Sequence, residues 1–213
     1  MKDFLSPDSL IGGFLTTIFN LMLLNILWLF SSIFVVTIGA STIALYTVTF
    51  KMTDKSKIQQ GVVKTYFKAF RDNFRQSIPV TIMFYVIVGM LFVNFNFSGM
   101  LSDSIRVVVY GASVALLILA VVIFEYMFPI IAIFNNSFMG YLLASIQLSF
   151  KNIFLTIIVF FVNIFIPVLT IIVPEVIAFI IPFTFLFGGS LVAYVVSRLM
   201  SGMMEKLKEN STN

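Results

Sequence analysis

The chain has 213 residues, of which 60% are hydrophobic and 10% are charged, and its mean hydropathy is +1.09. A water-soluble domain of this size needs more polar side chains to cover its surface, so the composition excludes that class and predicts an all-α, polytopic membrane helix bundle in one domain, residues 1–213. The chain has no cysteine, no histidine and a formal net charge of +4, which excludes disulfides, thiol chemistry and the commonest metal ligand.

The first long apolar stretch, residues 20–51, carries no charge before Lys51. We predict a first membrane span over 13–36, because about 20 apolar residues in a helix cross the hydrocarbon core. Residues 38–50 form either a second, short crossing or a re-entrant segment on one side. We favour the re-entrant alternative, because thirteen helical residues reach only about 20 Å.

The break in this stretch is predicted at small and hydroxyl residues: Thr37, Gly39, Ser41 and Thr42. We expect Gly39 to allow the break, and Thr37 or Ser41 to bond to the freed amide groups. Because an interrupted backbone at membrane depth must pack against protein, we also expect the other spans to close around this segment. Residues 39–46, which include Tyr46, either line a cavity or allow close helix approach.

Residues 51–77 hold seven of the thirteen cations, and they predict a cytoplasmic amphipathic helix. At helical spacing one face carries the cations and a neighbouring stripe carries aromatic rings: Lys64, Lys68, Arg71 and Arg75, beside Phe67, Phe70 and Phe74. Such a helix lies on a membrane surface, held by anionic headgroups, or docks a partner protein. The aromatic stripe favours lipid, so we expect no nucleic-acid partner.

Four more spans are predicted after this connector, at 78–95, 107–134, 153–173 and 176–197. With five spans, eleven of the thirteen cations fall on one side, leaving Lys2 and Arg106 on the other. The positive-inside rule then predicts a multi-pass protein of the cell membrane, with residues 51–75 and the carboxyl terminus in the cytoplasm. The amino terminus is outside, or inside if residues 38–50 cross.

Short motifs spread along the chain carry a family resemblance. They are Asn25-x-x-Trp28, Thr37-x-Gly39-Ala40-Ser41-Thr42-x-Ala44-Leu45-Tyr46, Tyr66-Phe67-x-x-Phe70-x-x-Asn73-Phe74-x-Gln76, and Phe128-Pro129 with Asn136. In these positions the sequence resembles the YesL family of bacterial membrane proteins. The resemblance implies a small multi-span protein of uncharacterised activity, encoded beside carbohydrate uptake systems and sensor kinases.

Glu125 is the one ionisable side chain inside a predicted span. A carboxyl group there is a candidate functional residue by default. We weigh a structural bond to a broken helix or loop amide, which we favour, against a proton or substrate role and against interfacial exposure. Asn25 and Trp28 lie one helical turn apart on the first span and share a face. Bonding between helices is the default for Asn25, and ligand contact is the alternative for both.

The sequence disfavours an enzyme, because it lacks histidine, cysteine, a Gly-x-Ser-x-Gly elbow and a phosphate-binding glycine loop. We expect no cofactor and no bound metal. The leading hypothesis is a non-catalytic accessory or regulatory membrane protein that serves a carbohydrate transporter or a sensor kinase. The alternatives are a small transporter or channel subunit that uses Glu125, and a lipid-organising protein.

Overall fold

The computed structural model describes residues 9–53, 61–172 and 177–212. In these residues the chain forms α-helices and short 3-10 helices without a strand, so the all-α prediction is confirmed. The α-helices are α1 Leu10–Ser31, α2 Ile38–Thr53, α3 Val62–Phe97, α4 Asp103–Ile133, α5 Phe138–Lys151, α6 Ile153–Ile172 and α7 Ile177–Thr212. The 3-10 helices are η2 Val35–Thr37 and η3 Ser98–Met100.

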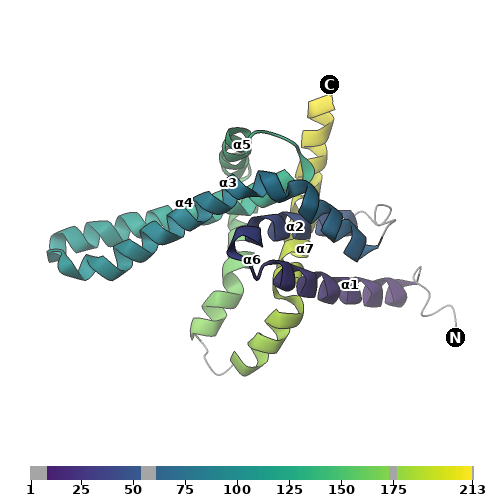
Figure 1. Ribbon diagram of the computed structural model, residues 1–213, viewed down its shortest axis with the longest axis horizontal. Helices are drawn as coiled ribbons and strands as arrows, with labels where there is room; N and C mark the ends of the chain where they lie inside the picture. Colours follow the sequence, from purple (N-terminus) through teal and green to yellow (C-terminus); the bar gives the residue numbers. More distant parts are fainter. Residues whose placement is uncertain (1–8, 54–60, 173–176, 213) are drawn as a thin grey trace.

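Helix α2 lies at the centre of the molecule, where it packs against α1, α3, α4 and α7 (Figure 1). Nine of its sixteen residues are buried, among them hydroxyl residues and small residues as well as aliphatic ones. The expectation that other helices close around this segment is therefore confirmed. The serine and threonine hydroxyls of α2 bond within the protein: Thr49 Oγ1, for example, lies 2.7 Å from Ser197 Oγ of α7.

The break before α2 lies at residues 32–37, ahead of Gly39, where we expected the chain to turn. Gly39 is already in the first turn of α2 and serves close packing instead. A Cβ at this position would collide with the Thr81 side chain and lie 3.2 Å from the backbone oxygen of Ser77, both on α3. The missing side chain therefore lets two helices approach each other.

Hydroxyl groups satisfy the backbone carbonyls that the break sets free. The Thr37 hydroxyl donates to the carbonyl of Ser31, and the Tyr85 hydroxyl of α3 donates to the carbonyl of Val35 at 3.1 Å. Ser41 Oγ donates to the carbonyl of Thr37 at 2.6 Å. We expected Thr37 or Ser41 to cover amide groups, and this is corrected: the end of α1 leaves carbonyls without intrahelical donors.

Five helical segments in the described part of the chain are long and apolar enough to cross a membrane: Ile11–Ser31, Val35–Thr53, Val62–Met100, Asp103–Ile133 and Ile180–Glu209. The second contains α2 and has 19 residues, more than the thirteen on which the re-entrant interpretation rested. The predicted span 153–173 corresponds to α6. It passes the same test only together with α5, from which it turns by 104°.

Residues 62–97 form one helix where the sequence predicted a surface connector followed by a separate span. Pro79 lies inside this helix of 36 residues, and the path of α3 changes direction along its length (Figure 1). Residues 54–60 of the predicted connector lie outside the described residues. Beyond Pro79, α3 runs beside α4 as a long hairpin, and α6 and α7 form a second hairpin that leaves the centre in another direction (Figure 1).

Candidate functional site

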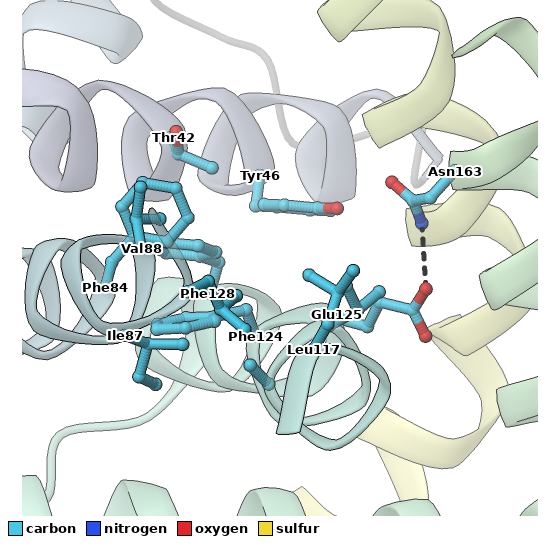
Figure 2. Close-up of a pocket in the computed structure, with 13 residues that line it drawn as sticks. Thr42, Tyr46, Phe84, Ile87, Val88, Leu117, Phe124, Glu125, Phe128 and Asn163 are labelled. Atoms are coloured by element: carbon cyan, nitrogen blue, oxygen red, sulfur yellow. Dashed lines mark hydrogen bonds between the residues drawn. The ribbon is translucent and has the colours of Figure 1, made fainter. Parts of the chain in front are cut away.

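Glu125 lies on α4 with only 7% of its surface exposed. Its Oε1 is 3.5 Å from the side-chain nitrogen of Asn163 on α6, a long hydrogen bond (Figure 2). Its Oε2 is buried without a hydrogen-bond partner; the only other buried polar side-chain atom of the described residues in that condition is Ser32 Oγ. Because an unpaired buried polar atom is costly, this oxygen is a candidate contact for a ligand.

The Glu125 side chain lines a pocket of about 280 Å³ between α2, α3, α4 and α6. Figure 2 shows two ends to this pocket. At one end Tyr46, Asn163 and Glu125 bring together a hydroxyl, an amide and a carboxyl group. At the other end the walls are apolar and largely aromatic, formed with Phe84, Phe124 and Phe128.

The aromatic end is an ordered cluster. The rings of Phe84 and Phe124 meet edge to face with centroids 5.4 Å apart, and those of Phe124 and Phe128 stack at 5.8 Å. Both arrangements are favourable for aromatic pairs. Phe124 and Phe128 are one turn apart on α4, so the same helix supplies the carboxyl group and two of the three rings.

Among the described residues, the lining of the pocket has one acidic group and no basic one, since neither lysine nor arginine is part of it. Within the described residues no three histidine, cysteine, aspartate or glutamate side chains meet as a metal site. Chemically, the site can therefore accept hydrogen bonds, balance one positive charge and surround an apolar group.

Among the predicted site residues, Thr42 and Tyr46 do line this pocket with Glu125. Tyr46 is buried, and Figure 2 shows its hydroxyl directed toward the end of the pocket where Asn163 lies. Gly39 lines a second, smaller cavity of about 70 Å³, which shares Thr42, Phe84 and Phe128 with the first. Thr37 and Ser41 lie apart from both cavities and bond to backbone carbonyls near the break.

Asn25 joins α1 to α7 and has no exposed surface. Its side-chain nitrogen donates to the carbonyls of Thr184 and Phe185, at 3.3 and 2.7 Å. Its side-chain oxygen accepts from the amide of Ser190 at 3.0 Å. The default interpretation, a bond between helices, describes this geometry.

Trp28 packs at the junction of α1, α2 and α7. Its indole nitrogen is 3.3 Å from Thr42 Oγ1, and a Cβ at Gly189 of α7 would lie 2.8 Å from the ring. The ring therefore needs the glycine opposite it. Trp28 does not line the Glu125 pocket, but its indole nitrogen bonds to Thr42, which does.

The outer face of α3 carries the predicted cations. Lys64, Lys68, Arg71 and Arg75 are all exposed, and we call these four side chains the cationic face. Phe67 beside them is 50% exposed, while Phe70 and Phe74 are half-buried. The side of α3 that packs inward is a different one, formed by Val62, Thr65, Tyr66 and Ala69.

Asn163, the hydrogen-bond partner of Glu125, was not among the predicted site residues. Its signal in the sequence is a lone amide within an apolar run, as for Asn25 on the first span. The motif residues Gln76 and Asn136 both bond to the hydroxyl of Tyr141. This hydroxyl donates to Gln76 Oε1 at 2.8 Å and accepts from the backbone amide of Asn136 at 2.8 Å. These motif residues fix the connection between α4 and α5 to α3.

Part of the chain, residues 21–95, is similar to a known protein family. No curated protein and no solved structure matches the chain. Residues 21–95, from α1 to most of α3, match a family described as "Protein of unknown function, DUF624". The matched range contains the cationic face and the α2 and α3 walls of the pocket, but neither Glu125 nor Asn163. Over these residues the chain is similar to an uncharacterised family.

Proposed function

We propose that this chain is a non-catalytic integral membrane protein that serves as an accessory or regulatory component of another membrane protein. The proposed partner is a carbohydrate transporter or a sensor kinase, a choice that rests on the resemblance to the YesL family. The proposed contact surface is the outer side of α3.

The observation that carries this proposal is a cationic face that has no ion-pair or hydrogen-bond partner among the described residues. The inner side of α3 is already filled, with Tyr66 fully buried against α1 and α2 through bonds to Ser31 and Ser41. Within the described residues none of the four cations forms an ion pair or a hydrogen bond. A helix that packs into the protein on one side and presents unpaired cations on the other is suited to recognise an acidic surface.

We further propose that the cationic face lies at the cytoplasmic surface of the cell membrane. Helix α2 ends near Lys51, α5 ends at Lys151, and α7 carries Arg198 and Lys206 beyond its apolar part. Helix α5 and the end of α7 extend to the same side of the molecule (Figure 1). The positive-inside rule favours the cytoplasm for these segments, where anionic lipids add attraction of about 1 kcal/mol per basic residue near the surface.

Cross-linking and co-purification from native membranes test this proposal. The full chain should recover a membrane protein partner, and the double substitution Lys68→Gln/Arg71→Gln should lower that recovery at least about tenfold, since charge pairing at an interface is lost. The double substitution Arg198→Gln/Lys206→Gln removes one lysine and one arginine elsewhere, and it should leave recovery unchanged. A chain that is always recovered alone, or equal losses in both variants, contradicts the proposal.

A second candidate function, a small transporter or channel subunit, is favoured by the unpartnered oxygen of Glu125. Ionisable side chains within spans commonly mark ion or substrate pathways. In proteoliposomes this function predicts a flux of protons or of a cationic substrate that Glu125→Gln abolishes. The exposed Glu205 of α7 offers the matched control, because Glu205→Gln removes the same charge at a residue that does not line the pocket. Flux that is equal in both variants counts against this candidate.

A further inference from the structure

We propose that the Glu125 pocket is a binding site for a small organic ammonium ion with an apolar, preferably aromatic, body. The proposal goes beyond the accessory role, because no residue of the cationic face lines this pocket. It also requires no transport, since a site can bind a ligand without moving it across the membrane.

The described lining of the site carries a single acidic group, Glu125. Glu125 is 7% exposed and its Oε2 has no partner, while the lining contains neither lysine nor arginine. An ionised carboxylate buried among apolar groups is tolerated when an opposite charge pairs with it. No described residue brings such a charge to the pocket, and a cationic ligand would supply it.

Other polar groups lie beside the Glu125 carboxyl group at the same end of the pocket. The Tyr46 hydroxyl forms no hydrogen bond within the described residues, and Figure 2 shows it directed to the end of the pocket that holds Asn163. An ammonium group has several N–H donors, and it can donate to Glu125 Oε2 and to this hydroxyl together. A neutral alcohol has one donor and no charge, so it satisfies this end less well.

The remainder of the pocket has the size and the walls to hold an apolar body. Its volume of about 280 Å³ is near the lower end of small-molecule sites, which run from about 300 to 1,000 Å³. The Phe84, Phe124 and Phe128 rings wall the apolar end with edge-to-face and stacked contacts. An aromatic body extends this cluster, and the ring faces also attract a nearby cation.

Two other occupants fit the same residues less well. A divalent metal ion such as calcium takes six to eight oxygen ligands, and the pocket has one carboxyl group with a few neutral oxygens. An anionic ligand would meet the Glu125 carboxylate with no cation nearby. The ligand chemistry that matches both ends is therefore cationic at one end and apolar at the other.

The ligand reaches the pocket from the side of α3 and α4. Val88 and Leu117 both line the pocket, and each is 43% exposed. This surface is apolar and, in a membrane, faces lipid. A ligand with an apolar body concentrates in that region before it binds.

The test uses the purified full-length chain in phosphatidylcholine nanodiscs at neutral pH, with phenethylammonium as the probe. Binding is measured by calorimetry and by the fluorescence of Trp28, the single tryptophan of the chain, which bonds to the pocket residue Thr42. We expect saturable binding of phenethylammonium. Phenethyl alcohol should bind at least about tenfold more weakly, because it lacks the charge that pairs with Glu125, and phenylacetate should not bind.

Two pairs of variants locate the site. Glu125→Gln should weaken phenethylammonium binding at least about tenfold, while Glu205→Gln should bind like the native chain. Val88→Phe fills the exposed edge of the pocket and should also weaken binding. Val86→Phe makes the same change on α3 at a position that is 55% exposed and does not line the pocket, and it should have no effect.

Three results would overturn the proposal: no saturable binding of phenethylammonium at millimolar concentration, equal affinity for the ammonium and the alcohol, or native affinity in a folded Glu125→Gln variant. If Glu125→Gln does not fold, the Val88→Phe and Val86→Phe pair and the ratio of the two probes on the native chain decide the question. Equal binding by the two valine variants places the probe elsewhere and also rejects the site.

Discussion

Helix α2 and the outer part of the α3–α4 hairpin show how differently two apolar segments of one chain are placed. We call residues 92–116, the outer part of that hairpin, the arm. In an apolar stretch of 18 residues in the span that contains α2, 56% of the residues are buried inside the protein, whereas the corresponding share is 17% for the stretches of α3 and α4. Yet α4 has a higher mean hydropathy than α2. The more apolar helix, α4, is therefore the more exposed of the two.

This order is the reverse of that in a soluble protein, and lipid as the surrounding solvent explains it. Lipid tails are as apolar as leucine, so exposed apolar side chains of the arm cost nothing in a bilayer. Burial of α2 depends instead on small residues and on hydroxyl groups that bond inside the protein, such as Ser41 and Thr49. The comparison teaches that in this chain burial follows side-chain size and hydrogen bonding more closely than hydropathy.

The largest expected effect comes from a matched pair of glycine substitutions. Gly39→Leu forces a side chain into α3 and should lower the free energy of unfolding by about 3 kcal/mol. Gly111→Leu places the same side chain in the arm, where a Cβ meets nothing within 4 Å, and should change it by less than about 0.5 kcal/mol. Equilibrium unfolding in mixed micelles, followed by Trp28 fluorescence, measures both. A large loss with Gly111→Leu would show that a second molecule packs against the arm.

A smaller difference is expected between two asparagines. Asn25→Leu removes three bonds to α7 and should cost about 1–2 kcal/mol. Asn96 is exposed in the arm, and its side chain donates only to the carbonyl of Phe92 in its own helix. Asn96→Leu should therefore leave the unfolding free energy nearly unchanged in the same assay. Equal costs would indicate that the arm, too, depends on polar contacts.

The smallest expected effect is the coupling energy of two single hydrogen bonds, one in the centre and one in the arm. The comparison of the two energies tests whether lipid surrounds the arm. Thr49 bonds to Ser197 at 2.7 Å in the centre, and Asn94 bonds to Ser113 at 3.0 Å in the arm. Double-mutant cycles with Thr49→Val/Ser197→Ala and Asn94→Leu/Ser113→Ala should each give a coupling energy of about 0.6 kcal/mol. If water surrounded the arm, it would compete for the second bond, and that coupling would fall toward zero.

Parts of the fold and of the site were accessible from the sequence because they depend on local spacing. The turn spacing of Asn25 and Trp28 placed them on one face, and the spacing from Lys64 to Arg75 placed four cations on one face. Glu125 stood out because it is charged within an apolar run. The break before α2 was placed a few residues too late, since small residues such as Gly39 mark close helix packing as well as turns.

The remainder depends on which helices meet. Asn163 is 38 residues from Glu125 and on another helix, and Asn25 bonds to α7 across 160 residues. No periodicity within one helix gives the rotation and depth at which a second helix crosses it. The expectation of separate connector and span in α3 failed for a related reason, because a polar half and an apolar half can belong to one continuous helix.

The sequence by itself determined that the chain is helical and rich in segments able to cross a membrane, because in lipid every backbone polar group of a long apolar run must be satisfied within its own helix. The tertiary structure alone decided that α2 is the buried centre and that Tyr46, Glu125 and Asn163 share one pocket. Those facts arise from side-chain packing between helices distant in the chain, which local hydrogen bonding and hydropathy do not specify.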